Sequence, residues 1–206
     1  MELHIYNIEG KDTGRKIKLS EEVFGIEPNE HCVYLDVKQY LANQRQGTHK
    51  AKERSEVSYS TKKIVKQKGS GGARHGSIKA GIFVGGGRMF GPRPRDYGFK
   101  LNQKTKEVAR KSALSAKVKE NAITIIEDFN LDEPKTKAYL NILSSLSIDS
   151  KKSLFIVGEY NKNIALSGRN LPKSKVRVAT ELNTYDLVNN EVIVLSESAV
   201  KKLNDL

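Results

Sequence analysis

Apolar residues follow two different spacings along this chain, and the spacings predict strands and helices. Near-continuous aliphatic runs are typical of buried strands, whereas apolar residues three and four positions apart are typical of amphipathic helices. The expected strands are residues 3–6, 17–19, 123–126, 154–157, 176–179 and 192–195. The expected helices are one capped by Asn29, one over residues 104–119, one opened by Pro134 and one capped by Ser196.

The order of these elements predicts the fold class. In the second half of the chain, aliphatic strands alternate with amphipathic helices, which is the pattern of a parallel sheet covered on both faces. We therefore predict a single three-layer globular α/β domain with a mostly parallel central sheet. It would be built from residues 1–43 and 101–206, with a long extended basic loop, residues 44–100, inserted after the first helix.

The inserted loop, which we call the arm, has too few apolar side chains to form a core. Between residues 44 and 77 the sizeable apolar residues are Val57, Tyr59, Ile64 and Val65, and 10 of the 16 glycines lie between residues 69 and 98. Such a segment cannot offset the entropy lost on ordering its backbone, so we expect a partner to order it. A solvated linker between two domains is the alternative, although residues 1–43 are few for an independent core.

Positive charge is concentrated around the arm. The chain has a formal net charge of +12, and residues 43–111 hold 18 Lys and Arg against 4 Asp and Glu. The rest of the chain holds 18 basic and 20 acidic residues. Because the excess lies in one third of the chain, we predict a polyanionic partner, with nucleic acid before all others.

The sequence offers little for catalysis, cofactors or export. It lacks the phosphate-loop pattern and the G-x-G-x-x-G spacing, and no two of its four histidines stand at metal-ligand spacing. Cys32 is the single cysteine, and no apolar run approaches the length of a membrane helix. We expect a soluble protein of a reducing compartment, without enzyme activity, cofactor, metal or membrane partner.

The arm contains the residue types that contact RNA. Arg and Lys bind phosphates, Gln, Ser, Thr and His offer further hydrogen bonds, and Phe83, Phe90, Tyr97 and Phe99 would stack on bases or pack the base of the arm. The candidate RNA-binding residues are Arg45, Gln46, Thr48, His49, Lys50, Lys52, Arg54, Lys62, Lys63, Lys66, Gln67, Lys68, Arg74, His75, Ser77, Lys79, Arg88, Arg93, Arg95 and Lys100.

Motifs spread over the whole chain resemble a known family. They are RQGTHK at 45–50, QKGSGGARHGS at 67–77, GGGRMFGPRPRDY at 85–97, KLN at 100–102, KSALS at 111–115, EPKTK at 133–137, RNLP at 169–172, YDL at 185–187 and AVKK at 199–202. In order and spacing they resemble the bacterial family of large-subunit ribosomal protein four.

That resemblance implies a structural constituent of the large ribosomal subunit in the cytoplasm. Its arm would thread through 23S rRNA, support subunit assembly and line the nascent-peptide exit tunnel. Its partners would be 23S rRNA, the nascent polypeptide and neighbouring ribosomal proteins, including large-subunit protein twenty-two. The residues implied at the tunnel-proximal tip are Lys66, Lys68, Gly69, Gly71, Gly72 and Arg74. The rival functions are an RNA-modifying enzyme and an mRNA-binding autoregulator that uses the same arm.

Overall fold

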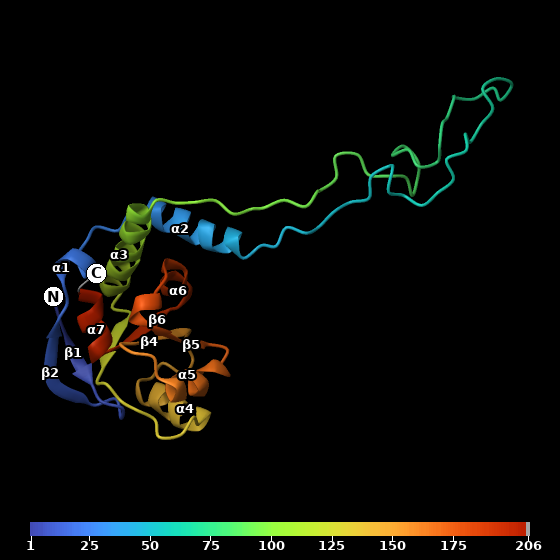
Figure 1. The fold of residues 1–206 in the computed structure, drawn as a ribbon. Helices are drawn as coiled ribbons and strands as arrows, with labels where there is room; N and C mark the ends of the chain where they lie inside the picture. Colours follow the sequence, from blue (N-terminus) through green and yellow to red (C-terminus); the bar gives the residue numbers. More distant parts are fainter. Residues whose placement is uncertain (205–206) are drawn as a thin grey trace. The chain divides into compact units, whose positions relative to one another are not determined.

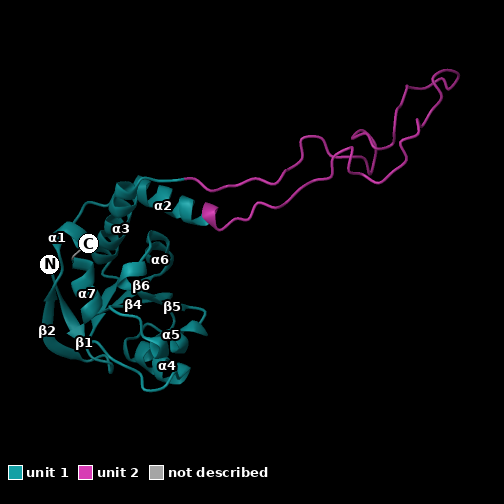
Figure 2. Ribbon diagram, in the orientation of Figure 1, with its two compact units in different colours: residues 1–41, 100–206 teal, residues 42–99 magenta. Residues whose placement is uncertain are grey.

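The computed structural model describes residues 1–204, which form two compact units. The first unit combines residues 1–41 with the chain from Lys100 onward, and the second unit is Ala42–Phe99 (Figure 2). No helix within residues 1–204 is long and apolar enough to cross a membrane.

The first unit is built on one mixed sheet of six strands. The strands are β1 (Glu2–Tyr6), β2 (Asp12–Lys18), β3 (Ile123–Ile126), β4 (Ser153–Val157), β5 (Ser174–Val178) and β6 (Val192–Ser196), in the order β2-β1-β3-β6-β4-β5. Every neighbouring pair is parallel except β1 and β2, which form an antiparallel edge. The prediction of a mostly parallel central sheet is therefore confirmed.

Helices cover both faces of this sheet (Figure 1). They are α1 (Glu21–Phe24), α2 (Glu30–Asn43), α3 (Gln103–Lys119), α4 (Thr136–Ser145), α5 (Lys162–Arg169), α6 (Thr184–Asn189) and α7 (Glu197–Asn204), with a short 3-10 helix, η1 (Ala179–Glu181). Two predicted caps are present: the Cys32 amide donates to Asn29 Oδ1 at 3.0 Å, and the Ala199 amide donates to Ser196 Oγ at 3.2 Å.

Strand residues alternate between two cores, which gives the three layers. Ile125 and Ile156 point to one core, closed by α1, α3, α6 and α7. Their neighbours in sequence, Ile126 in β3 and Phe155 in β4, face the opposite way. These two residues belong to a second core with Tyr139 of α4, and α5 also contributes to this core. Because the side-chain period of a strand is two, a continuous aliphatic run supplies both cores at once.

Three details differ from the expectations. A four-residue helix, α1, precedes α2, so the second unit follows the second helix of the chain and not the first. Helix α4 begins at Thr136, two residues after the expected Pro134. The amphipathic helix expected after Asn29 should bury its apolar residues, but Leu41 of α2 is 45 % exposed. Gln39 is the one buried residue of α2. The spacing of apolar residues in the sequence therefore predicted more burial of this helix than the structure shows.

Tyr139 makes the stability of the first unit sensitive to alkaline pH. Its ring is fully buried between α4 and the sheet, and burial raises its pKa to about 12. An unfolded tyrosine ionises near pH 10, so between about pH 10 and 12 the unfolded state releases a proton that the folded state keeps. The free energy of unfolding should therefore fall by on the order of 3 kcal/mol across that window.

Denaturant titrations of the native chain and of Tyr139→Phe at several pH values test this expectation. The variant also loses the hydrogen bond between Tyr139 Oη and Ser174 Oγ, at 2.9 Å, so the slope with pH is the informative quantity and not the absolute stability. The variant should lose clearly less stability than the native chain above pH 10. Parallel pH profiles for the two proteins would refute the assignment.

Candidate nucleic-acid interface

The second unit is a segment folded back on itself. Backbone hydrogen bonds join its two halves from Arg95 N to Gly47 O (3.1 Å), Ala51 N to Pro92 O (3.0 Å), Arg88 N to Lys52 O (2.9 Å) and Ile64 N to Gly76 O (3.0 Å). Beyond the end of α2, residues 44–99 contain one isolated antiparallel bridge, Lys63 with Ser77, and no helix or longer strand. The two halves therefore run antiparallel, and the chain reverses between residues 64 and 76.

Two glycines allow the halves to approach closely. Gly47 has φ +64°, and a Cβ atom there would lie 2.0 Å from the carbonyl oxygen of Arg95. Gly87 is the one buried residue of the second unit, and a Cβ atom there would lie 2.4 Å from the amide nitrogen of Arg54. Only glycine fits such approaches without moving the opposite half, so these positions serve the pairing of the segment with itself.

The predicted RNA-binding side chains face solvent. All the candidates are exposed except His75, Ser77 and Lys79, which are half-buried. Lys100 falls in the first unit, just past the boundary at Phe99, whereas the other candidates belong to the second unit. The second unit carries 13 Lys and Arg against three Asp and Glu, so its accessible surface is strongly positive.

Tyr97 gathers three of the candidate residues. The guanidinium of Arg45 lies 3.6 Å from the centre of its ring and that of Arg95 lies 4.4 Å from it, while the Tyr97 hydroxyl is 3.1 Å from His49 Nε2. Cation–π attraction orients both guanidiniums over one ring. The Tyr97 ring therefore brings two cationic side chains and His49 together at one place on the segment.

Two carboxylates hold cations in place within the second unit. Glu53 pairs with Arg93, with an Oε1 to Nε distance of 2.6 Å, and Glu56 pairs with Lys50. The hydrogen bond from Lys50 keeps the pKa of Glu56 below its usual range. These pairs were not foreseen from the sequence, where the two glutamates stand out only as acids inside a basic block. They fix the side chains of Lys50 and Arg93 against the backbone that carries them.

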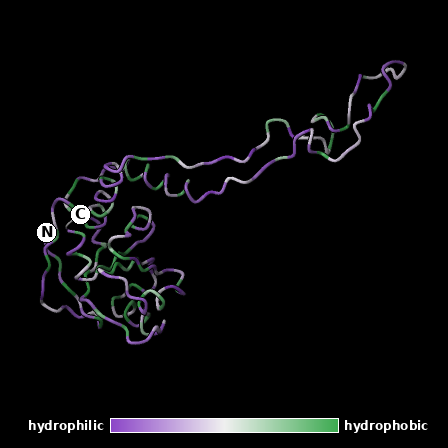
Figure 3. The backbone as a smooth tube through the Cα atoms, in the orientation of Figure 1, coloured by the Kyte–Doolittle hydropathy of each residue, from purple (hydrophilic) through white to green (hydrophobic). Residues whose placement is uncertain are grey.

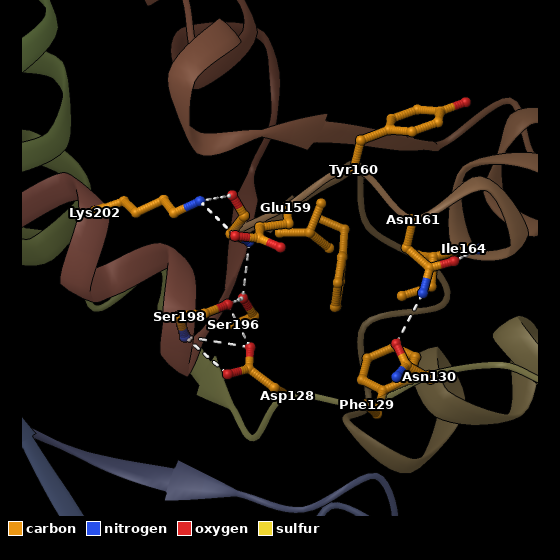
Figure 4. Close-up of a pocket in the computed structure, with 13 residues that line it drawn as sticks. Asp128, Phe129, Asn130, Glu159, Tyr160, Asn161, Ile164, Ser196, Ser198 and Lys202 are labelled. Atoms are coloured by element: carbon orange, nitrogen blue, oxygen red, sulfur yellow. Dashed lines mark hydrogen bonds and ion pairs between the residues drawn. The ribbon is translucent and has the colours of Figure 1, made fainter.

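A pocket in the first unit tests the enzyme alternative. It lies at the carboxyl ends of β3, β4 and β6, where open parallel sheets usually bind ligands (Figure 4). Several of its polar groups hold α7 in place: the Asp128 carboxylate accepts from Ser198 Oγ at 2.6 Å and from the Ser198 amide at 3.1 Å. Lys202 donates to the carbonyl of Gly158 at 3.0 Å and to Glu159 at 3.3 Å.

Gly158, in the turn after β4, packs closely against α7. A Cβ atom at Gly158 would lie 2.3 Å from Ser198 Oγ, so this glycine lets α7 approach the turn. The residues that line the pocket include neither histidine nor cysteine. Within residues 1–204, no three His, Cys, Asp or Glu side chains gather as metal ligands would. The polar groups of this pocket therefore serve the packing of the fold.

The class of protein defined so far is an α/β domain with a basic, exposed segment that lacks a core. Comparison with known proteins gives the family: the model described as "Ribosomal protein L4/L1 family" matches residues 17–206, and the chain belongs to this family. It is 62 % identical over its full length to a protein of Cytophaga hutchinsonii named "Large ribosomal subunit protein uL4", covering 99 % of that protein. Proteins of the same name from Bacteroides fragilis and Christiangramia forsetii are 55 % and 61 % identical, over 100 % and 98 % of this chain and 99 % and 97 % of theirs.

Family membership decides the broad role. The chain is a structural protein of the large ribosomal subunit, located in the ribosome in the cytoplasm, and it is not an enzyme. The resemblance seen in the sequence motifs is therefore confirmed, and the RNA-modifying alternative is set aside.

Proposed function

We propose that the second unit is the part of this protein that binds 23S rRNA, and that its binding supports assembly of the large subunit. The observation that carries the proposal is the exposure of its cations. The second unit has 13 Lys and Arg against three Asp and Glu, and only one of its residues is buried. Each contact with a phosphate would release counterions, which favours binding. The predicted arm, residues 44–100, and its candidate contact residues are the interface that we assign to rRNA.

Binding and ordering of this segment would be coupled. Its halves are joined by backbone hydrogen bonds and close glycine contacts, but it buries almost no apolar surface. In isolation such a segment gains little free energy from order, whereas phosphates along both halves would neutralise its charge and hold it extended. Folding of the segment would therefore accompany its incorporation into the subunit.

We assign the reversal of the second unit to the peptide exit tunnel. The reversal is closed at its base by the bridge between Lys63 and Ser77, and Gly69 and Gly71 have φ of +86° and +66° at its middle. Nothing lies within 4 Å of a Cβ placed on either glycine, so the turn is open to its surroundings. The resemblance in the sequence motifs implies the nascent polypeptide and large-subunit protein twenty-two as neighbours of this tip, and we propose both as its partners.

Sedimentation of the full-length chain with purified 50S-type subunits tests the assignment to rRNA. The native chain should remain with the large subunit at moderately high salt, because many cations of the second unit contact phosphates at the same time. A matched variant that replaces Arg45, Arg93 and Arg95 by Gln keeps the length and the glycines and should be released at lower salt. Equal retention of the two proteins would argue that the first unit provides the attachment.

Lys68→Glu tests the position of the tip. Lys68 is exposed and precedes Gly69 in the reversal, so a reversed charge there should alter the tunnel wall while the remaining cations still hold the segment. We expect normal sedimentation profiles with a changed response of cells to a macrolide, a tunnel-binding antibiotic. Lys52→Glu, in the paired part of the segment, is the matched control: it reverses the same charge away from the tip and should leave the response to the macrolide unchanged. Defective subunits with a normal drug response for Lys68→Glu would contradict the tip placement.

A further inference from the structure

Residues 79–91 form a loop inside the second unit, which we call the 79–91 loop, and its residues 79–87 are closed by backbone hydrogen bonds. Gly87 N donates to Lys79 O at 3.0 Å, and Gly86 N donates to Phe83 O at 3.0 Å. A Cβ atom at Gly86 would lie 2.0 Å from the carbonyl oxygen of Ala80. The backbone of residues 79–87 is thus packed against itself.

The loop displays apolar side chains on a strongly basic segment. Ile82 is 75 % exposed, Val84 103 %, Met89 69 % and Phe90 101 %. Figure 3 shows short hydrophobic stretches along this otherwise hydrophilic part of the chain. Phe90 also has φ +50°, a conformation that is uncommon for an aromatic residue.

Phe90 differs from the other aromatic residues proposed for stacking. Tyr97 already lies under the guanidiniums of Arg45 and Arg95, and the Phe83 ring contacts the His75 ring edge-on, with 5.2 Å between centres. Phe90, by contrast, offers both ring faces to solvent. The structure therefore singles out Phe90 as the aromatic residue that is accessible to a flat partner.

Two arginines border the same place. The hollow there is lined by Ala51, Glu53, Arg88, Met89, Phe90, Gly91 and Arg93. Glu53 holds Arg93 there through its ion pair at 2.6 Å, and the side chain of Arg88 passes 3.2 Å from where a Cβ of Gly91 would stand. An accessible aromatic ring with two arginines in the same hollow is complementary to a nucleotide, which combines a flat base with flanking phosphates.

We propose that Phe90 stacks on an unpaired base of the bound RNA, while Arg88 and Arg93 bind the phosphates next to that base. This inference rests on the proposed function, because it names the kind of nucleotide that the second unit receives. Charge favours RNA over an apolar protein surface as the occupant: a protein partner would have to bury both guanidiniums beside the ring.

The affinity of three chains for deproteinised large-subunit rRNA tests the proposal. Phe90→Leu keeps the backbone strain and the apolar character but removes the ring, and it should weaken binding about 5- to 150-fold. Val84→Ala, at an equally exposed site in the same loop, should bind like the native chain. Neither variant changes charge, so the dependence of affinity on salt should be the same in all three. Native affinity for Phe90→Leu would overturn the stacking role while leaving electrostatic binding intact.

A fluorescent probe separates stacking from contact with a protein. The chain has no tryptophan, so Phe90→Trp introduces a single indole, and Tyr160→Trp places one on the first unit at a position 71 % exposed. Free rRNA should strongly quench the emission of Phe90→Trp, because a base stacks on the indole, and should leave Tyr160→Trp nearly unchanged. Quenching that requires the assembled subunit and is missing with free rRNA would identify a protein occupant and refute the proposal. Binding of rRNA without any salt dependence would instead refute the proposed function itself.

Discussion

Removal of residues 46–99 should abolish rRNA binding and leave a folded domain. The shortened chain, closed by a short glycine linker, retains 24 Lys and Arg and 21 Asp and Glu, so most of the positive excess is lost. Both cores of the first unit are made of residues outside the deletion. Closing a shorter loop costs little entropy. We expect affinity for rRNA to fall by at least about two orders of magnitude, on the basis of the phosphate contacts removed.

Circular dichroism and a thermal melt measure whether the shortened chain folds, and a filter-binding titration measures its affinity for rRNA. The helix signal and a cooperative melt should persist while binding disappears. A smaller deletion of residues 65–75 is the matched control: it removes the tip, keeps the cations of the paired halves and should reduce binding only modestly. Loss of the helix signal in the large deletion would mean that the segment belongs to the core of the protein.

The sheet was predictable from the sequence, but its order was not. Apolar runs such as residues 154–157 are buried on both faces of the sheet, and their apolar residue types predict that burial. β6 lies between β3 and β4 in the sheet. This placement depends on how the helices pack across the sheet, and no single segment of the sequence predicts it. Helices α1, α5 and α6 were not predicted, and α1 and α6, at four and six residues, are too short for apolar spacing to show. Asn161 and Asn183 cap α5 and α6, and these caps were the available signal.

The character of the interface was predictable and its internal contacts were not. Lysine, arginine and glycine in excess over apolar residues indicate an exposed polyanion-binding segment whatever its path. The contacts of Tyr97 with Arg45, and of Gly87 with Arg54, join residues 52 and 33 positions apart. They depend on the register of the two halves, which is set by close glycine approaches and backbone hydrogen bonds. The full exposure of Phe90 likewise follows from its loop and from no local motif.

The salt dependence of rRNA binding tests the central claim most directly. If six cations of the second unit neutralise phosphates, a log–log plot of the association constant against salt concentration should have a slope of roughly −4 to −5. Between about 50 and 200 mM monovalent salt the affinity should then fall roughly 300- to 1,000-fold. The measurement is a fluorescence or filter-binding titration of the full-length chain with deproteinised large-subunit rRNA at several salt concentrations. A steep linear decrease is the result that the structure predicts, and a slope near zero would contradict electrostatic docking of the second unit on rRNA.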